Sequence, residues 1–341
     1  MNKAKYYIGI DISSEYFTVS ILTTKSMKTD SLENFENSIN GFGKLLKEFQ
    51  SQKIKASDCI ACMEATGVYG EQLAYFLISE GFSVVIENPL KVKRAFDLSP
   101  KKTDKIDSKR IAEYALRFVD ELKAWTPKSQ IIEEIRVFLT QREQFSVQRI
   151  SNINAKKALG KKFYSSEKAI QMYKEMIKKC EENIKNIDKE ILSLIEKEPE
   201  YRQTIANITS IPGIGNMLAF NLLAVTNGFK EHMNSKELAS YAGIVPLPFE
   251  SGKSIRKKNT SSGIGPGKIR KLLFMASMTS RMHNKEMKEY FLRKVAEGKN
   301  KRLVLNNIGN KLLKIIIALA RNRKSYIENF ISINPVFLKN S

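Results

Sequence analysis

Near its start the chain carries Tyr6-Tyr7-Ile8-Gly9-Ile10-Asp11-Ile12, an apolar stretch interrupted by one carboxylate. A short apolar run of this kind predicts a buried β-strand. An ionised carboxylate in the middle of such a strand is costly to bury unless it is paired or binds a metal. Asp11 is therefore the first candidate for a functional site.

Strand and helix patterns alternate in the residues that follow. A second β-rich run at 17–24 predicts a hairpin with the first strand. The pattern then predicts helices at about 38–50, 70–80 and 104–119, with strands at 58–63 and 82–86 between them. Such alternation is typical of an α/β domain. Its predicted end is at Trp125-Thr126-Pro127, so the domain spans residues 1–127.

Three more carboxylates stand where they could join Asp11. Glu64 follows the strand predicted at 58–63, at the carboxyl edge where α/β sheets place their sites. Asp104 and Asp107 are three residues apart at a helix start, which puts both on one helical face. Four such carboxylates suit a two-metal centre for phosphoryl transfer, and hard oxygen ligands select Mg²⁺ or Mn²⁺. The alternative for Asp104 and Asp107 is a favourable interaction with the helix dipole alone.

Residues 128–200 are helix-forming and highly charged. A heptad seam predicts a coiled-coil arm, and it runs through Ile170, Tyr173, Ile177, Cys180, Ile184, Ile187, Ile191 and Leu194. A preceding helix around Ile135 could be its antiparallel partner, although Arg142 and Arg149 interrupt the apolar stripe there. An intramolecular hairpin and a dimerisation strut both remain open.

The third region, 201–330, is predicted to be helical apart from a loop at 251–267, and 331–341 form a C-terminal tail. Its turn Ile211-Pro212-Gly213-Ile214-Gly215 fits either a helix-hairpin-helix or a plain interhelical turn. In the first case Gly213 and Gly215 let backbone amides approach a phosphate. The cations expected to neutralise phosphates are Lys253, Arg256, Lys257, Lys258, Lys268, Arg270 and Lys271.

The composition favours a nucleic-acid partner. The net charge is +21 with a pI near 9.7, and residues 251–341 alone hold 21 Lys and Arg against 4 Asp and Glu. No apolar run reaches the roughly 18 residues of a membrane span, and the start lacks a signal peptide. Three cysteines, an odd count, argue against a disulfide framework. We therefore expect a cytoplasmic protein with no membrane partner.

Cysteine and histidine chemistry is poorly supported. Cys59 and Cys62 form a CxxC with no second Cys or His pair nearby, so buried strand cysteines are expected there. The histidines are His232 and His283, which do not support a histidine base. His283 is expected to be structural or to contact phosphate.

In order and spacing these residues resemble the transposases and site-specific recombinases of the IS110 insertion-sequence family, which also contains the Piv-type DNA invertases. The N-terminal hallmarks are Ile8-Gly9-Ile10-Asp11, Glu64-Ala65-Thr66-Gly67 and Lys102-Thr103-Asp104-Lys105-Ile106-Asp107. The C-terminal ones include Ile211-Pro212-Gly213-Ile214-Gly215, Tyr241-Ala242-Gly243-Ile244-Val245-Pro246 and Ser251-Gly252. The resemblance covers nearly the whole chain. Ser108 departs from it, since Ala is usual at that position.

The resemblance implies an α/β plus all-α chain. Its parts would be a RuvC-like domain with a ribonuclease H fold, a coiled-coil arm and a helical transposase domain with a helix-hairpin-helix. The DEDD tetrad would be Asp11, Glu64, Asp104 and Asp107, and Ser251 would form a covalent serine–DNA intermediate. The resemblance also implies a noncoding bridge RNA that pairs with donor and target DNA. A homo-oligomer, dimer or tetramer, would complete each site with a tetrad that comes from another protomer.

We therefore predict a nucleoid-associated transposase that cuts and rejoins DNA at element ends and target. One alternative is a structure-selective endonuclease of the Holliday-junction type, which would use the carboxylates and water alone. The other is a nucleic-acid-binding protein without enzymatic activity.

Overall fold

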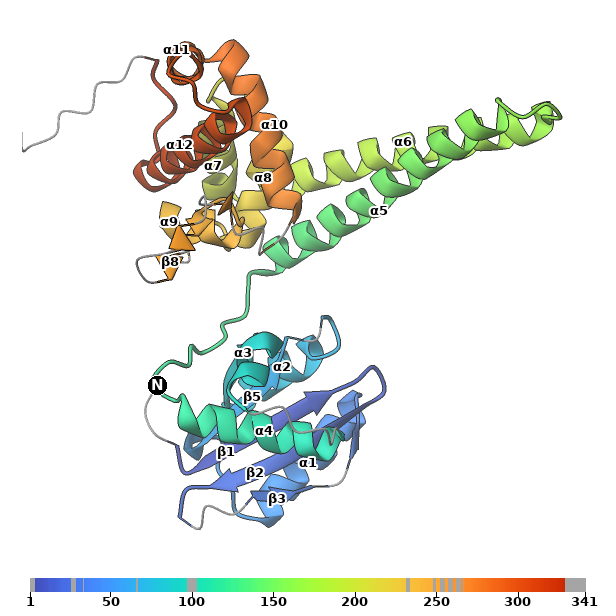
Figure 1. The fold of residues 1–341 in the computed structure, drawn as a ribbon. Coiled ribbons are helices and arrows are strands. Elements are labelled where there is room, and N and C mark those ends of the chain that lie inside the picture. Colours follow the sequence, from blue (N-terminus) through green and yellow to red (C-terminus); the bar gives the residue numbers. More distant parts are fainter. Residues whose placement is uncertain are drawn as a thin grey trace, which may run out of the picture. The chain divides into compact units, whose positions relative to one another are not determined.

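The computed structural model describes residues 4–25, 29–32, 34–65, 67–96, 103–230, 234–247, 250–251, 255–256, 260–261, 265 and 267–328. The chain divides into two compact units, unit 1 (Met1–Pro127) and unit 2 (Lys128–Ser341) (Figure 1). Each unit has hydrophobic core clusters of its own. The described part combines one mixed sheet in unit 1 with helices in both units, so the predicted mixed α/β class is confirmed.

One sheet organises unit 1. Its strands are β1 (Tyr6–Ile12), β2 (Tyr16–Thr23), β3 (Thr29–Ser31), β4 (Phe35–Glu36), β5 (Cys59–Glu64) and β6 (Ser83–Glu87). The order is β3-β2-β1-β5-β6, and β4 also pairs with β2. The strands β1 and β2 form an antiparallel hairpin, whereas β1, β5 and β6 run parallel. Because parallel neighbours need crossover connections, helices follow β5 and precede it.

Helices cover both faces of this sheet. On one face, α1 (Ile39–Ser51) and α2 (Glu71–Ser79) pack with Ile8 and Ile10 of β1. On the other, α4 (Asp104–Arg117) packs with Tyr7, and α3 (Pro89–Arg94) adds Val92 to the same cluster. Since β1 is covered on both faces, its sequence shows no polar alternation and is apolar apart from Asp11.

Gly9 sets the distance between β1 and α4. A Cβ atom at Gly9 would lie 2.0 Å from the Ser108 carbonyl oxygen and 2.3 Å from the Ala112 backbone nitrogen. The helix therefore rests on the strand backbone itself. At the same crossing the Ser108 hydroxyl lies 2.8 Å from that of Ser20, the residue opposite Gly9 on β2. This hydrogen bond satisfies the buried Ser108 hydroxyl.

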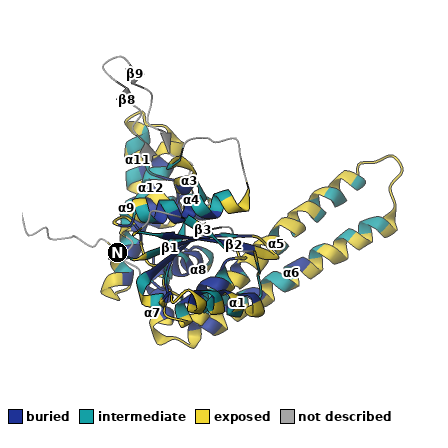
Figure 2. Cartoon of the chain, turned by 90° about the horizontal axis from the view of Figure 1, so that it is seen from below, coloured by how far each residue is buried: buried dark blue, intermediate teal, exposed yellow. Residues whose placement is uncertain are grey.

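The arm is a pair of long helices, α5 (Gln130–Leu159) and α6 (Glu167–Glu196), that pack against each other within the chain (Figure 1). Arg142 donates to Asp188 at 2.6 and 3.1 Å, and Arg149 donates to Glu181 at 2.7 Å. The arginines that interrupt the apolar stripe of α5 thus reach across to α6. Within one chain the two helices thus form the intramolecular hairpin, and Figure 2 shows intermediate and exposed residues along most of its length.

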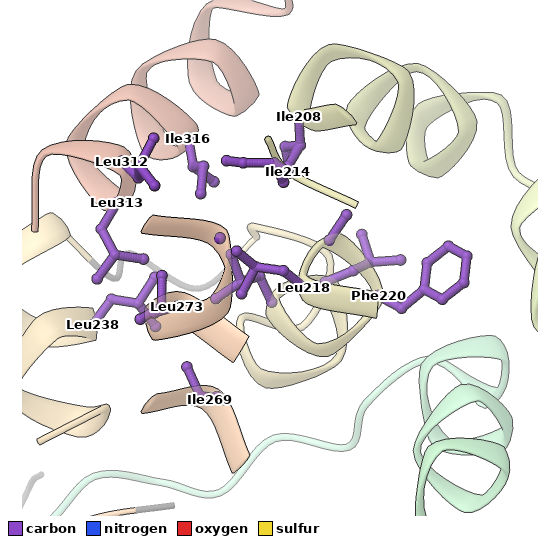
Figure 3. Packing of buried hydrophobic residues seen from close by; sticks show 14 of the residues in the cluster. Ile208, Ile214, Leu218, Phe220, Leu238, Ile269, Leu273, Leu312, Leu313 and Ile316 are labelled. Carbon is purple, nitrogen blue, oxygen red and sulfur yellow. The ribbon is translucent and has the colours of Figure 1, made fainter. Parts of the chain in front are cut away.

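The remainder of unit 2 is a helical bundle. Its helices are α7 (Pro199–Thr209), α8 (Asn216–Val225), α9 (Ser235–Tyr241), α10 (Gly267–His283), α11 (Lys285–Ala296) and α12 (Lys301–Asn322). Figure 3 shows how Leu218 of α8, Leu273 of α10 and Leu312 of α12 meet in its core. By length and composition α12 could cross a membrane, but half of its apolar window is buried inside unit 2. We interpret α12 as a core helix.

Short strands occur between residues 246 and 261, a segment that overlaps the loop predicted at 251–267. They are β7 (Pro246–Leu247), β8 (Glu250–Ser251), β9 (Ile255–Arg256) and β10 (Thr260–Ser261), with β7 paired to β10 and β8 paired to β9. The sequence did not predict these strands, neither at 246–250, which was predicted to be helical, nor within the loop at 251–267, because pairings of two residues leave no periodic pattern in a Gly- and Lys-rich sequence.

Candidate functional site

Asp11 and Glu64 end two neighbouring parallel strands. In the β1–β5 ladder Gly9 is opposite Cys62 and Ile10 is opposite Met63, so the next residues along each strand are Asp11 and Glu64. Side chains alternate along a strand, and Tyr7 and Gly9 face α4. Asp11 therefore points to the α4 side of the sheet.

The first turn of α4 brings the other two carboxylates to this side. Thr103 caps the helix by accepting a hydrogen bond from the Ile106 amide at 3.3 Å. Ser108 lies over Gly9, and α4 runs against β1, so its N-terminal turn extends toward the end of that strand (Figure 1). Asp104 is one helical turn before Ser108, and Asp107 adjoins it. We call Asp11, Glu64, Asp104 and Asp107 together the carboxylate edge.

The four side chains of the carboxylate edge do not form a complete metal site. Among the described residues, which include all four carboxylates, no group of three His, Cys, Asp or Glu side chains could hold a metal ion. Asp107 instead pairs with Arg110 of its own helix at 3.6 Å. The donor chemistry, carboxylate oxygens gathered at one end of the sheet, still fits a divalent cation. Binding would require the side chains to approach one another further.

The acidic residues at this end of the sheet contribute to the pKa of the Cys62 thiol. Burial raises the pKa of the Cys62 thiol to about 12, and the charges of Glu87 and Glu64 contribute to the same shift. Burial likewise raises the pKa of Cys59 to about 12. Both thiols are buried and free, as the sequence predicted for strand cysteines. Both are therefore neutral thiols at neutral pH.

Ser251 lies on β8, opposite Ile255 of β9. Arg256, another predicted site residue, follows on β9. Lys253, Lys257 and Lys258 lie outside the described residues. The serine is thus carried by a hairpin of two short strands within unit 2.

The glycine turn between α7 and α8 gives its two glycines different roles. Gly213 has a φ of +97°, and a Cβ there would lie 2.4 Å from the Ser280 backbone nitrogen. The Ser280 hydroxyl also donates to the Pro212 carbonyl at 2.9 Å. Packing against α10 therefore explains Gly213. Gly215 has no atom within 4 Å of a Cβ position and precedes α8 without a side-chain cap, so this helix N-terminus is open.

The predicted phosphate-binding cations at the start of α10 contact different parts of unit 2. The Lys268 amine donates to the Leu139 carbonyl of α5 at 2.9 Å and lies 3.9 Å from Glu143. Burial lowers the pKa of Lys268. Arg270 and Lys271 line a separate cavity beside α12. Lys268 thus contacts α5, whereas Arg270 and Lys271 line the cavity.

Comparison with known proteins identifies the family. Residues 8–164 match the DEDD transposase family of the IS110 type, and residues 205–292 match the transposase family IS116/IS110/IS902. Over 328 residues the chain is 30% identical to the pilin gene-inverting proteins of Moraxella lacunata and Moraxella bovis, covering 95% of this chain and 98% of each relative. The chain belongs to the IS110 family of transposases.

A further relative of this IS110-family transposase is the transposase for insertion sequence element IS1533 of Leptospira borgpetersenii. The two are 25% identical over 263 residues, 69% of this chain and 73% of the relative. The protein is thus a DNA transposase and recombinase enzyme, as the sequence predicted. The segment 8–164 contains the whole carboxylate edge, and 205–292 contains Ser251. DEDD transposases use divalent metal, which agrees with the donor chemistry of the edge.

Sequence reasoning missed a fifth carboxylate of the transposase. Glu87 ends β6 opposite Glu64. It accepts hydrogen bonds from the Asn88 amide at 2.8 Å and the Tyr114 hydroxyl at 3.3 Å, and it pairs with Lys91 at 3.1 Å. Burial and the Glu87 charge raise the pKa of Tyr114 to about 12. The sequence contained a signal for this carboxylate, because Glu87 directly follows the strand predicted at 82–86, just as Glu64 follows the strand predicted at 58–63.

Proposed function

We propose that this transposase cuts and rejoins DNA through a transient covalent bond to Ser251, with metal held at the carboxylate edge. The observation that carries the proposal is the β1–β5 register, which sets Asp11 and Glu64 at neighbouring strand ends beside the first turn of α4. An antiparallel hairpin joined to parallel strands, with α4 across one face, supports a RuvC-like, ribonuclease H type of domain. Asp11, Glu64, Asp104 and Asp107 would hold Mg²⁺ or Mn²⁺.

In the proposed reaction the Ser251 oxygen forms a bond to the scissile phosphorus, while the bond from phosphorus to the departing deoxyribose oxygen breaks. A hydroxyl of another DNA strand then attacks the same phosphorus and releases the serine. The number of phosphodiester bonds is conserved, so no hydrolysis occurs. Bound divalent metal would stabilise charge on the phosphate oxygens. The relatives named pilin gene-inverting proteins support rejoining, because inversion requires it.

Unit 2 would bind the nucleic acids. The open N-terminus of α8 at Gly215 suits a helix-hairpin-helix contact to a backbone phosphate. The excess of Lys and Arg in residues 251–341 would serve element-end DNA, target DNA and a noncoding guide RNA. A homo-oligomer, dimer or tetramer, would pair the serine of one protomer with the carboxylate edge of another. It would act in the cytoplasm on nucleoid DNA, without a membrane.

Ser251→Ala tests the covalent step. The protein is incubated with its element-end DNA, candidate RNA and Mg²⁺, and denaturing gels then show any protein–DNA adduct. The wild type is expected to form one and Ser251→Ala to form none, because the attacking oxygen is gone. Ser254→Ala, three residues further along, is the matched control and should retain the adduct. Cleavage by Ser251→Ala at the wild-type rate would instead indicate a hydrolytic nuclease that uses water alone.

A further inference from the structure

A basic cavity of about 590 Å³ lies between α10, α12 and Ile244. Its charged lining residues are Arg270 and Lys271 of α10 and Arg302 of α12, and none of the described residues that line it is Asp or Glu. Three cations around one hollow repel one another unless an anion joins them. Lys271 and Arg302 are exposed, so a ligand can reach them from solvent.

Arg270 is the residue that makes this hollow unusual. Its Nη1 atom is buried and has no hydrogen-bond partner among the described residues. A buried guanidinium donor without a partner is costly in an isolated chain. The preceding and following core residues of α10, Ile269 and Leu273, are anchored in the bundle (Figure 3). Packing of these neighbours sets the backbone position of Arg270, and its buried Nη1 has no acceptor among the described residues.

The surrounding groups complete a site for an anion. A Cβ at Gly267 would lie 3.7 Å from the Arg270 Nη2 atom, which places the guanidinium beside the first turn of α10, the positive end of that helix. The Asn306 amide donates to the Ile244 carbonyl at 2.9 Å, which ties α12 to the wall of the cavity. The Ser277 hydroxyl donates to the Leu273 carbonyl at 2.7 Å. Polar groups already bonded in this way make a rigid lining.

We propose that this cavity binds one phosphodiester group of a nucleic-acid strand, held by Arg270, Lys271 and Arg302. The inference rests on the proposed function and adds a separate backbone-binding site to it. Guanidinium groups match phosphate oxygens bidentately, and a planar fork with one buried free donor suits that geometry. The cavity is also flanked in sequence by the stretch 245–266 that carries Ser251, since Ile244 and Gly267 both line it. A strand bound here would contact unit 2 where the segment 245–266 begins and ends.

Charge removal at the exposed lining residues tests the cavity. Binding of fluorescein-labelled double-stranded DNA, single-stranded DNA and RNA of one sequence is measured by fluorescence anisotropy at several salt concentrations. The double variant Lys271→Gln, Arg302→Gln is expected to bind at least one probe on the order of tenfold more weakly, with a salt slope reduced by about 1. The probe most affected identifies the strand that occupies the cavity. The control is Lys314→Gln, an exposed cation of α12 that does not line the cavity. An effect of the double variant no larger than that of the control, on all three probes, would overturn the inference.

Arg270→Met separates a ligand-binding role from a structural one. Removing a buried donor that has no partner is expected to leave the melting temperature unchanged or raised, while affinity for the sensitive probe falls on the order of tenfold. Unchanged affinity would overturn the role of Arg270. The wild-type Ser251 adduct is assayed in parallel. An adduct with no effect of the cavity variants would leave the proposed reaction standing, whereas a cavity effect with no adduct would overturn the reaction alone.

Discussion

Among single residues, Gly9 has the clearest structural consequence for the candidate site. It has no side chain, so the backbone of α4 approaches the backbone of β1 directly. The first turn of that helix carries Asp104 and Asp107, and Asp11 is two residues beyond Gly9. The spacing among these carboxylates is thus controlled by a residue that has no functional group.

Gly9→Ala is expected to destabilise unit 1. The new methyl group would overlap the Ser108 carbonyl, so α4 must move outward at a cost of about 1–3 kcal/mol. The melting temperature should fall, and strand cleavage should fall further because Asp104 and Asp107 move with the helix. Gly43→Ala in α1 is the matched control, since no atom lies within 4 Å of its Cβ position. It should stabilise by up to about 1 kcal/mol through helix propensity. Equal melting temperatures for the two variants would contradict this account.

Asp11 and Glu64 could be predicted from the sequence, because an ionised acid within or at the end of an apolar strand is costly to bury without a partner. The role of Ser108 could not, since its hydrogen-bond partner Ser20 is 88 residues away and lies next to it only in the folded sheet. The pairing of Asp107 with Arg110 was also unforeseen, because both residues fit an exposed helical face equally well. Local patterns identify the carboxylates, whereas their mutual distances depend on tertiary packing.

At the scale of elements, the heptad seam predicted α6, and the partner helix α5 had a weaker apolar stripe. Arg142 and Arg149 explain that weakness, because they form ion pairs with Asp188 and Glu181 of α6. A stripe interrupted by arginine is thus compatible with a helical hairpin when the facing helix carries acids at matching positions. Such half-exposed pairs contribute modestly to stability but favour this register over shifted ones.

Lys268 connects the arm to the bundle, and Lys268→Met tests this role. Its amine donates to the Leu139 carbonyl of α5, so its removal takes this hydrogen bond from a partly buried carbonyl. A loss of about 1–2 kcal/mol in the free energy of unfolding is expected. Affinity for nucleic acid, measured by anisotropy, should fall less than in the double variant Lys271→Gln, Arg302→Gln. A large loss of affinity for nucleic acid at unchanged stability would instead indicate that Lys268 binds phosphate.

At the scale of the whole molecule, charge and carboxylates are divided between the two units. Residues 1–127 hold 18 Lys and Arg against 17 Asp and Glu, whereas 251–341 hold 21 against 4. A nearly neutral unit 1 would neither repel a divalent metal at the carboxylate edge nor strongly attract DNA. We therefore expect phosphate binding in unit 2, and the proposed chemistry would depend on both units.

This division predicts that Asp11→Asn separates binding from reaction. The variant should bind DNA with the affinity and salt slope of the wild type, a slope of about 0.9 for each phosphate neutralised. Formation of the Ser251 adduct should fall at least about 100-fold, the upper end of the losses seen for residues that only support metal ligands. Asp120→Asn, an exposed acid of the same unit, is the matched control and should change neither quantity. If Asp11→Asn weakened binding and adduct formation in equal proportion, the carboxylate edge would contribute to DNA affinity and the division of roles would fail. If the variant kept the adduct, the metal would have to be held by other groups.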